Sequence, residues 1–523
     1  MSNNNLVTLE QDVSFSQSLL WKYQKDYFAQ KGINAWANSS VPFYVTSNMV
    51  IAYSYAQMAL RFIQDNLANG TIDPKQPIYL FELATGSGKL SYLFLHLFKQ
   101  FLQQLRLDYL DFHYVMTDFT TNNLQYWQSH ECLKPFAASG MLDFAIFDIG
   151  TMQNITLINS KVVLDTNSCK NPIIVIANYT FDTVNHDLFR IAGGNLEAGY
   201  ITTKTTQDNI IPDGIQDLER LQTDFTFQPI KLPFYQDNNL NAILDYYHKN
   251  LNDTTFLVPL GAIAAVDNLA RIANNRLLLL SCDKGFTSID ALKNLSKPHI
   301  AFHGSFSMMV NFDFLGRYME QLGGDTALAE DYEGTKVSVF CLGFKFNQLP
   351  NTTWAIDQFN THFATNEFLL IKNFLIRDTS KLDMEHILAL LKFSYWDTDI
   401  FFSVASRIAE IITKSSPGQI KAMHLGLKTL DDHFYFVRNY KNIPFEIGHI
   451  YQVLNDLEAA IKFYQKTIDL YGEESSTYFN MGLCRYHKHD VSIALECFEK
   501  AYALNSNNAS AKEWIDHINK SKK

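Results

Sequence analysis

Short apolar runs alternate with longer amphipathic stretches from residue 78 to residue 283. The first cycle comprises the apolar run IYLFEL at 78–83, a helical pattern at 89–105 and the apolar run DFHYVMTD at 111–118. This alternation predicts βαβ units and a parallel sheet, because the strands of such a sheet are buried on both faces. We therefore predict an α/β fold, in which four further runs extend the sheet: 142–149, 171–178, 275–283 and 336–346.

Two later regions depart from this alternation. Residues 200–260 are polar and rich in Asn, Asp and Gln, and they contain Pro212, Pro229 and Pro233. We predict that they form a subdomain inserted on the substrate side of a first domain at 1–375. After about residue 375 the strand pattern stops and apolar residues recur at helical spacing, which predicts a helical bridge over 376–442.

The last eighty residues repeat with a period of 34. Small and aromatic residues recur at this interval, which is the period of tetratricopeptide (TPR) repeats. The small residues let paired helices approach each other, and the aromatic residues fill the space between them. We predict TPR repeats over 443–523, ending in a capping helix at 508–520. The recurring positions are Gly448 and Gly482, Ala460 and Ala494, Tyr464 and Phe498, and Thr467 and Ala501.

Composition and charge narrow the class of protein. The 523 residues suffice for about three to four domains. The formal net charge is −11, so no overall basic field attracts nucleic acid or anionic lipid. The six cysteines are scattered without C-x-x-C spacing, which predicts no metal site. No signal-peptide pattern or long apolar run occurs, so we expect a soluble cytoplasmic protein and leave open export without an N-terminal signal.

The glycine-rich segment FELATGSGKLSYLF at 81–94 allows two interpretations. A nucleotide-binding P-loop, G-x-x-x-x-G-K-[ST], needs glycine at position 83 and a hydroxyl group at position 90. This chain has Leu83 and Leu90, so the ligand for Mg²⁺ is missing. The alternative is a strand, an acidic residue, a tight glycine turn and a helix. It is similar to motif I of class I S-adenosylmethionine (SAM) methyltransferases, E-x-G-x-G-x-G.

The similarity to motif I implies roles for acidic residues that end strands. Glu82 suits a cofactor with two cationic groups, and Ala84 replaces the first glycine of the motif. Asp118 can accept hydrogen bonds from ribose hydroxyls, and Asp148 can lie beside adenine. Each aspartate is equally well explained as a cap at a strand end. The cofactor-binding residues implied in full are Glu82, Ala84, Gly86, Gly88, Asp118, Phe119, Asp148, Tyr44 and Thr46.

Four segments in order resemble the MidA-like SAM methyltransferases, the family of the mitochondrial complex I assembly arginine methyltransferase. The resemblance covers about residues 40–345 and implies a Rossmann-like class I methyltransferase sheet with SAM as cofactor. The TPR region lies outside it. The matching segments are VPFYVTSNMVIAYSYAQMA (41–59), ELATGSGKL (82–90), ANYTFDTVNHDLF (177–189) and HGSFSMMVNFDFLGRYMEQLGG (303–324).

The loop after the fourth strand departs from the family pattern where the target nitrogen is expected. Tyr179 replaces a glutamate and Asn185 replaces a proline, which leaves Asp182 as the acidic residue of this loop. Arginine methylation benefits from carboxylates that hold the guanidinium group, so arginine is a doubtful substrate. The candidate catalytic residues are Asp182, Asn178 and Tyr179. A capped strand-to-helix turn explains Asp182 and Asn178 without catalysis.

These features together predict a SAM-dependent methyltransferase that acts on a protein side-chain nitrogen. The TPR region is expected to recruit a protein partner or substrate. The alternative is a catalytically inactive, methyltransferase-like adaptor that acts through its TPR region. Neither nucleic acid nor a membrane is an expected partner, and the oligomeric state is not predicted.

Overall fold

The chain forms two compact units. The computed structural model describes residues 6–36, 43–212, 214–330, 334–362 and 365–521. The first unit comprises residues 1–47 and 51–368, and the second comprises 48–50 and 369–523. The division falls inside helix α10 (Thr365–Ile376), near the position 375 at which the sequence pattern changes.

The first unit contains a large, mostly parallel sheet with the strand order β18-β19-β14-β7-β2-β3-β4. Its parallel core strands are almost entirely buried, which explains their continuous apolar sequences. The strands expected from these sequences are confirmed. They are β2 (Ile78–Leu83), β3 (Phe112–Asp118), β4 (Leu142–Ile146), β7 (Ile173–Asn178), β14 (Leu277–Phe286) and the antiparallel β19 (Thr335–Leu342), with β18 (Asp325–Ala327) at the edge and β17 (Val310–Asn311) paired to β14.

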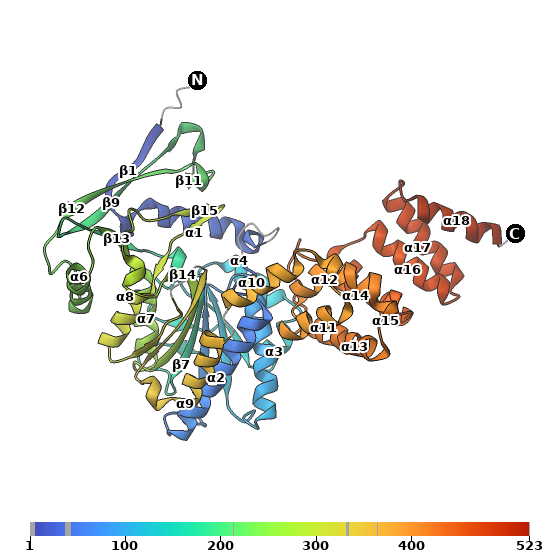
Figure 1. The fold of residues 1–523 in the computed structure, drawn as a ribbon, viewed down its shortest axis with the longest axis horizontal. Coiled ribbons are helices and arrows are strands. Elements are labelled where there is room, and N and C mark those ends of the chain that lie inside the picture. Colours follow the sequence, from blue (N-terminus) through green and yellow to red (C-terminus); the bar gives the residue numbers. More distant parts are fainter. Residues whose placement is uncertain (1–5, 37–42, 213, 331–333, 363–364, 522–523) are drawn as a thin grey trace. The chain divides into compact units, whose positions relative to one another are not determined.

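Helices cover both faces of this sheet (Figure 1). On one face, Phe81, Val175 and Leu279 belong to one large core with residues of α7 (Leu260–Ile272) and α8 (Phe312–Gln321). On the other face lie α2 (Met49–Ala68) and α3 (Lys89–Gln104). There Phe94 and Tyr114 place their ring centroids 5.3 Å apart. The chain is thus an α/β protein in which the sheet is enclosed between helical layers.

The strand order reverses between β2 and β7. From β2 the chain runs outward to β3 and β4, and it then returns to build β7 and β14 on the opposite side of β2. Two adjacent connections diverge at such a point and leave a crevice beyond the carboxyl ends of the strands, where open α/β sheets bind ligands. The topology therefore locates a binding site above the ends of β2 and β7.

The chain also forms a second, antiparallel sheet, which extends beyond the polar segment 200–260. It starts at residue 187 and recruits the N-terminal strand β1, which pairs with β9. The polarity of 200–260 does not reveal this partner, because β1 lies about 190 residues earlier in the chain. The strands are β1 (Leu6–Ser14), β8 (Asp187–Ala192), β9 (Asn195–Thr206), β12 (Gln222–Pro229) and β13 (Thr254–Val258).

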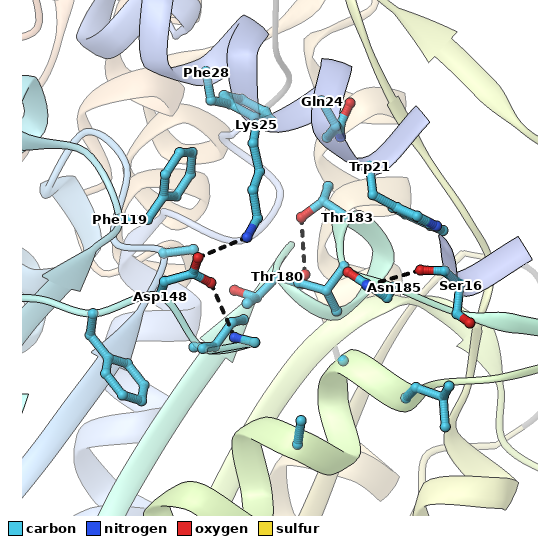
Figure 2. Close-up of a pocket in the computed structure, with 18 of the residues that line it drawn as sticks. Ser16, Trp21, Gln24, Lys25, Phe28, Phe119, Asp148, Thr180, Thr183 and Asn185 are labelled. Atoms are coloured by element: carbon cyan, nitrogen blue, oxygen red, sulfur yellow. Dashed lines mark hydrogen bonds and ion pairs between the residues drawn. The ribbon is translucent and has the colours of Figure 1, made fainter. Parts of the chain in front are cut away.

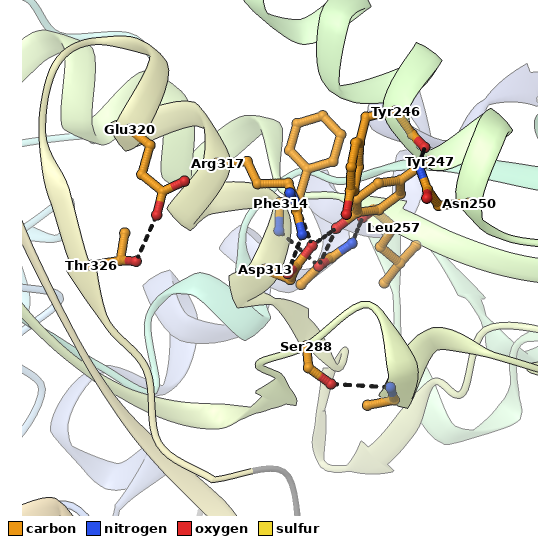
Figure 3. A network of polar contacts seen from close by, with 12 residues as sticks. Tyr246, Tyr247, Asn250, Leu257, Ser288, Asp313, Phe314, Arg317, Glu320 and Thr326 are labelled. Atoms are coloured by element: carbon orange, nitrogen blue, oxygen red, sulfur yellow. Dashed lines mark hydrogen bonds and ion pairs between the residues drawn. The ribbon is translucent and has the colours of Figure 1, made fainter.

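A buried polar network ties α8 to helix α6 (Asn238–Asn250) (Figure 3). The Asp313 carboxylate accepts hydrogen bonds from Tyr247 Oη at 2.6 Å and Arg317 Nε at 2.7 Å. Asn311 caps α8 by accepting from Phe314 N at 3.0 Å. These contacts give the segment 303–324 a structural role, because they fix the helix that covers the sheet.

The second unit is entirely helical in its described part. Helices α14 to α18 pack against one another in chain order (Figure 1). The helices expected after residue 380 are confirmed, including the last one. They are α11 (Met384–Phe393), α12 (Thr398–Ile411), α13 (Pro417–Asp432), α14 (Ile443–Val453), α15 (Leu457–Tyr471), α16 (Ser475–His487), α17 (Val491–Leu504) and α18 (Ala509–Ser521).

The two recurring glycines lie where paired helices touch. A Cβ atom on Gly448 would come 3.1 Å from the Tyr464 ring, and one on Gly482 would come 2.8 Å from the Phe498 ring. The 34-residue spacing therefore places a glycine against an aromatic ring in both helix pairs.

Within the described residues, no helix combines the length and apolar character needed to cross a bilayer.

The close approach at Gly482 gives a testable expectation. Gly482→Ala should lower the free energy of unfolding by about 1–3 kcal/mol, because the added methyl group must displace the Phe498 ring. Urea unfolding followed by circular dichroism measures this change. Gly418→Ala is the matched control, since its nearest neighbouring atom would lie 4.0 Å away. Equal losses in both variants would contradict the packing role of Gly482.

Candidate functional site

A cavity of about 230 Å³ lies at the carboxyl ends of the central strands. Its walls include Ala84 after β2, Asp118 at the end of β3, Asp148 after β4 and Thr180 after β7. The start of α7 contributes Leu260, Gly261 and Ala264. The cavity therefore occupies the switch point of the sheet, where the topology locates a ligand.

The N-terminal helix α1 (Leu19–Lys31) contributes a further wall of the cavity (Figure 2). This helix was not predicted from the sequence, although Ser18 gives a signal for it. The Ser18 side chain caps the helix by accepting from Leu20 N at 3.2 Å. The residues of α1 that line the cavity are Trp21, Gln24, Lys25 and Phe28.

The glycine-rich turn after β2 adopts the strained backbone expected of it. Ala84, Gly86 and Gly88 all have positive φ angles, of 48°, 61° and 79°. The Trp127 Nε1–H donates to the Gly86 carbonyl at 2.9 Å, and the Trp36 ring covers Gly86 so closely that a Cβ atom would lie 2.9 Å from it. Ala84 lines the cavity, whereas Gly86 and Gly88 do not. The glycines thus shape the turn and make room for Trp36.

Glu82 lies beneath this turn and is not among the residues that line the cavity. Its carboxylate accepts hydrogen bonds from Ser91 Oγ and, at 2.8 Å, from Tyr114 Oη. Burial raises the pKa of Glu82 to about 7. The structure therefore places Glu82 where it joins β2 to α3 and β3, rather than against a ligand.

Asp118 lies in the cavity wall with its carboxylate held in place by its own chain. One oxygen accepts from Thr120 N at 2.9 Å and the other from Asn123 Nδ2 at 2.9 Å. Burial raises its pKa above the ordinary value. Asp118 thus presents a fixed hydrogen-bond acceptor in the cavity wall, and Phe119 beside it adds an apolar ring to the wall.

Asp148 forms an ion pair with a residue that the sequence did not single out. Lys25 Nζ of α1 lies 2.8 Å from Asp148 Oδ2, while Oδ1 accepts from Gly150 N at 3.1 Å (Figure 2). The Lys25 and Asp148 side chains are 45% and 26% exposed, so their pairing contributes little to stability. The ion pair therefore brings the positive charge of Lys25, on α1, next to the Asp148 carboxylate in the cavity wall.

The three candidate catalytic residues lie behind the cavity wall. Asn178 accepts from Tyr55 Oη at 2.8 Å and donates to the Thr46 carbonyl at 3.2 Å. Tyr179 has a positive φ of 49°, and Asp182 is 6% exposed. None of them is among the residues that line the cavity. The same loop faces the cavity through other residues: Thr180, Thr183, Val184 and Asn185.

Tyr44 and Thr46 also lie outside the set of residues that line the cavity. The Tyr44 ring lies under Lys89 Nζ, 5.6 Å from its centroid, and Thr46 is buried beside Asn178.

His186 is fully buried, and its Nε2 lies 2.9 Å from the Phe181 carbonyl. Burial lowers its pKa to about 4, so this imidazole is neutral at pH 7. Among the described residues, no cluster of three or more His, Cys, Asp or Glu side chains could hold a metal ion.

Comparison with known proteins gives structural neighbours but no family. No protein-family model matches the chain, and no curated protein matches it in sequence. Among solved structures, one neighbour is a superfamily member and "likely methyl transferase" from Burkholderia thailandensis, crystallised with S-adenosyl-homocysteine (SAH). Another is an uncharacterized protein of the same superfamily and organism, in its native form. Both are 13% identical, with TM-scores of 0.39, and the alignments cover 63% of this chain and 88% or 87% of theirs. At these values the likeness carries no functional argument for this chain.

Proposed function

We propose that this protein is a SAM-dependent methyltransferase. The observation that carries the proposal is the Asp118 carboxylate, which ends β3, lines the switch-point cavity and is held in place by Thr120 and Asn123. Two adjacent ribose hydroxyls of a nucleoside match this arrangement. The wall holds two carboxylates, Asp118 and Asp148, against one cation, Lys25, and this net negative charge disfavours a phosphate-rich ligand and suits a cationic one.

The residues of the cavity fit SAM in distinct ways. Asp118 would accept the ribose hydroxyls, and Phe119 and Asp148 would lie on the adenine side. The turn at Ala84 brings the main chain close to the ligand without a bulky side chain. Glu82, Gly86 and Gly88 would act indirectly, because they build that turn. SAM would supply a methyl group already activated by its sulfonium leaving group.

The chain's own residues would align the acceptor and exclude water. Thr180, Thr183 and Asn185 face the cavity from the loop after β7 and are suited to position an acceptor group. We propose a protein side-chain nitrogen as that acceptor. The catalytic roles of Asp182, Asn178 and Tyr179 remain predictions, and their buried positions favour action through the loop.

Calorimetric titration with SAH tests the cofactor proposal. The wild-type protein should bind SAH and SAM, and it should bind NADH and ATP more weakly, since the two carboxylates of the wall outnumber its one cation and the net negative charge repels phosphate. Absence of SAM and SAH binding at millimolar concentration would contradict the enzyme and leave the adaptor as the better explanation.

We further propose that α14 to α18 form TPR-type repeats that recruit the protein substrate. The 34-residue recurrence and the glycine–aromatic contacts in both helix pairs support this proposal. Labelling of a cell lysate with radioactive SAM tests it. The full chain should label a protein that a chain ending at residue 442 labels at least about tenfold less, if the recruiting region supplies a high effective concentration. Equal labelling by both chains would argue against recruitment.

A further inference from the structure

Two buried carboxyl groups meet behind the wall of the cavity. The side chains of Asp182, after β7, and Asp283, in β14, are hydrogen-bonded to each other. Asp283 is 0% exposed and Asp182 is 6% exposed. The Oδ1 atom of each meets no hydrogen-bond donor among the described residues. Each carboxyl group therefore has a buried oxygen that a proton on its neighbour could satisfy.

A hydrogen bond between two carboxyl groups requires one proton. Two ionised carboxylates in contact inside a protein repel each other, and neither can donate. Neutralising both would leave no charged acceptor for the main-chain amides that point at Asp283. The pair therefore holds one proton and one negative charge, and its protonation behaviour belongs to the pair.

Asp283 also holds the loop that forms the cavity wall. Its Oδ2 accepts from Thr180 N at 3.3 Å and Phe181 N at 3.1 Å. Thr183 Oγ1 donates to the Thr180 carbonyl at 3.0 Å, which closes the turn that carries Asp182. Because Thr180 and Thr183 both line the cavity, the position of the Asp283 carboxyl group determines the position of that wall.

We propose that the Asp182–Asp283 pair shares a single proton that fastens the loop after β7 to β14, and that Asp283 is the positioning residue for the ligand in the cavity. This inference rests on the proposed function for the identity of the ligand. Loss of the proton would charge both carboxyl groups and separate them. The turn would then move with Asp182, and the cavity wall would lose its shape.

Other titratable groups lie near the pair, but at neutral pH they do not donate the proton that the two carboxyl groups share. Burial raises the pKa of both carboxyl groups above the ordinary aspartyl value, and the charge of Asp182 raises that of Asp283 further. Lys284 is exposed and lowers the pKa of Asp182 by its charge, and burial keeps the neighbouring thiol and phenol groups protonated. The groups that act on the pair or are acted on by it are Lys284, Cys282, Tyr55 and Tyr179.

A measurement without ligand tests the shared proton. The shared proton leaves with the higher of the pair's two pKa values, which burial and the neighbouring carboxylate raise well above the ordinary value of an aspartyl group. Because this pKa is raised in the folded state, the stability that the proton gives is complete below the unfolded pKa and is lost as pH rises through the folded pKa. In Asp283→Asn, the amide accepts from the same two N–H groups and donates to Asp182, so no proton is needed. As pH rises from 6 to 10, the midpoint of thermal unfolding should fall more steeply in the wild type than in Asp283→Asn. Identical slopes would overturn the proposal.

Binding of SAH tests the positioning role. The wild-type affinity should fall by at least about tenfold between pH 6 and pH 10, since the singly protonated pair becomes scarce above the higher of its two pKa values, which is raised well above the ordinary value. Asp283→Asn should bind with a nearly constant affinity, and Asp283→Ala should bind more weakly at every pH. An affinity of Asp283→Asn that falls as steeply as that of the wild type would overturn the proposal.

Two further variants keep these tests decisive. If Asp283→Asn does not fold, Asp182→Asn replaces it, because its amide can donate to Asp283 and the same flat pH profiles are expected. Asp143→Ala is the matched control: Asp143 is 2% exposed and accepts from the main-chain amides of Asn159 and Ser160 at 2.7 and 2.9 Å, but it does not line the cavity. It should lose stability and keep the wild-type pH profile of binding.

If the wild type binds no SAH, the proposed function fails, while the unfolding profiles still decide whether the two carboxyl groups share a proton.

Discussion

Replacement of Asp118 by alanine is expected to weaken SAH binding by at least about 100-fold, the largest functional effect that the structure implies. Hydrogen bonds to a charged acceptor contribute about 1.5–3 kcal/mol each. The alanine variant would lose the two that the carboxylate accepts from the ribose hydroxyls. Calorimetry of the wild type and Asp118→Ala at one pH measures the change.

Controls for Asp118→Ala separate binding from folding. The substitution also removes the acceptor for Thr120 N and Asn123 Nδ2, so thermal unfolding of the apoprotein must be recorded. Asp118→Asn retains an acceptor for one hydroxyl and should have an intermediate affinity. Asp111→Ala removes an exposed carboxylate just before β3 and should bind SAH as the wild type does. Unchanged SAH affinity in Asp118→Ala would remove Asp118 from the cofactor site.

Replacement of Trp127 by alanine is expected to cause the largest loss of stability, about 3–5 kcal/mol. Trp127 is 0% exposed in α4 (Thr121–Ser129) and stacks on Phe144 of β4. Its Nε1–H is also the donor to the Gly86 carbonyl in the glycine-rich turn. Chemical unfolding of the variant should therefore show a lower midpoint, and SAH binding should weaken because the turn loses its anchor.

Two other tryptophan variants identify the cause of this loss. Trp127→Phe keeps most of the ring but leaves the Gly86 carbonyl without its donor, so it should lose about 1–3 kcal/mol. Trp354→Ala removes a side chain that is 56% exposed and should change stability by at most about 0.5 kcal/mol. A Trp127→Ala protein as stable as Trp354→Ala would contradict the role assigned to the buried indole.

The sequence places a residue near the cavity where the residue's position follows from its place at a strand end. Asp118 and Asp148 follow buried strands and both line the cavity. Glu82 also lies in a strand end, but its side chain points beneath the turn, toward Ser91 and Tyr114. Successive side chains of a strand point to opposite faces, so a strand-end position does not determine which of them meets a ligand.

The missed features depend on contacts between distant parts of the chain. Lys25 lies 123 residues before Asp148, and Asp283 lies about 100 residues after Asp182. No local periodicity links such pairs. The N-terminal strand β1 was missed for the same reason, since its stability comes from pairing with β9.

The sequence by itself determined the alternating strands and helices, the glycine-rich turn and the 34-residue recurrence of glycine and aromatic residues. These features are local, because burial on both faces imposes continuous apolar runs and helix pairing imposes small residues at a fixed spacing. The tertiary structure alone decided which side chains enclose the cavity. It placed Lys25 beside Asp148, Trp36 over Gly86 and Asp283 against Asp182, because these contacts arise only when segments far apart in the chain are packed together.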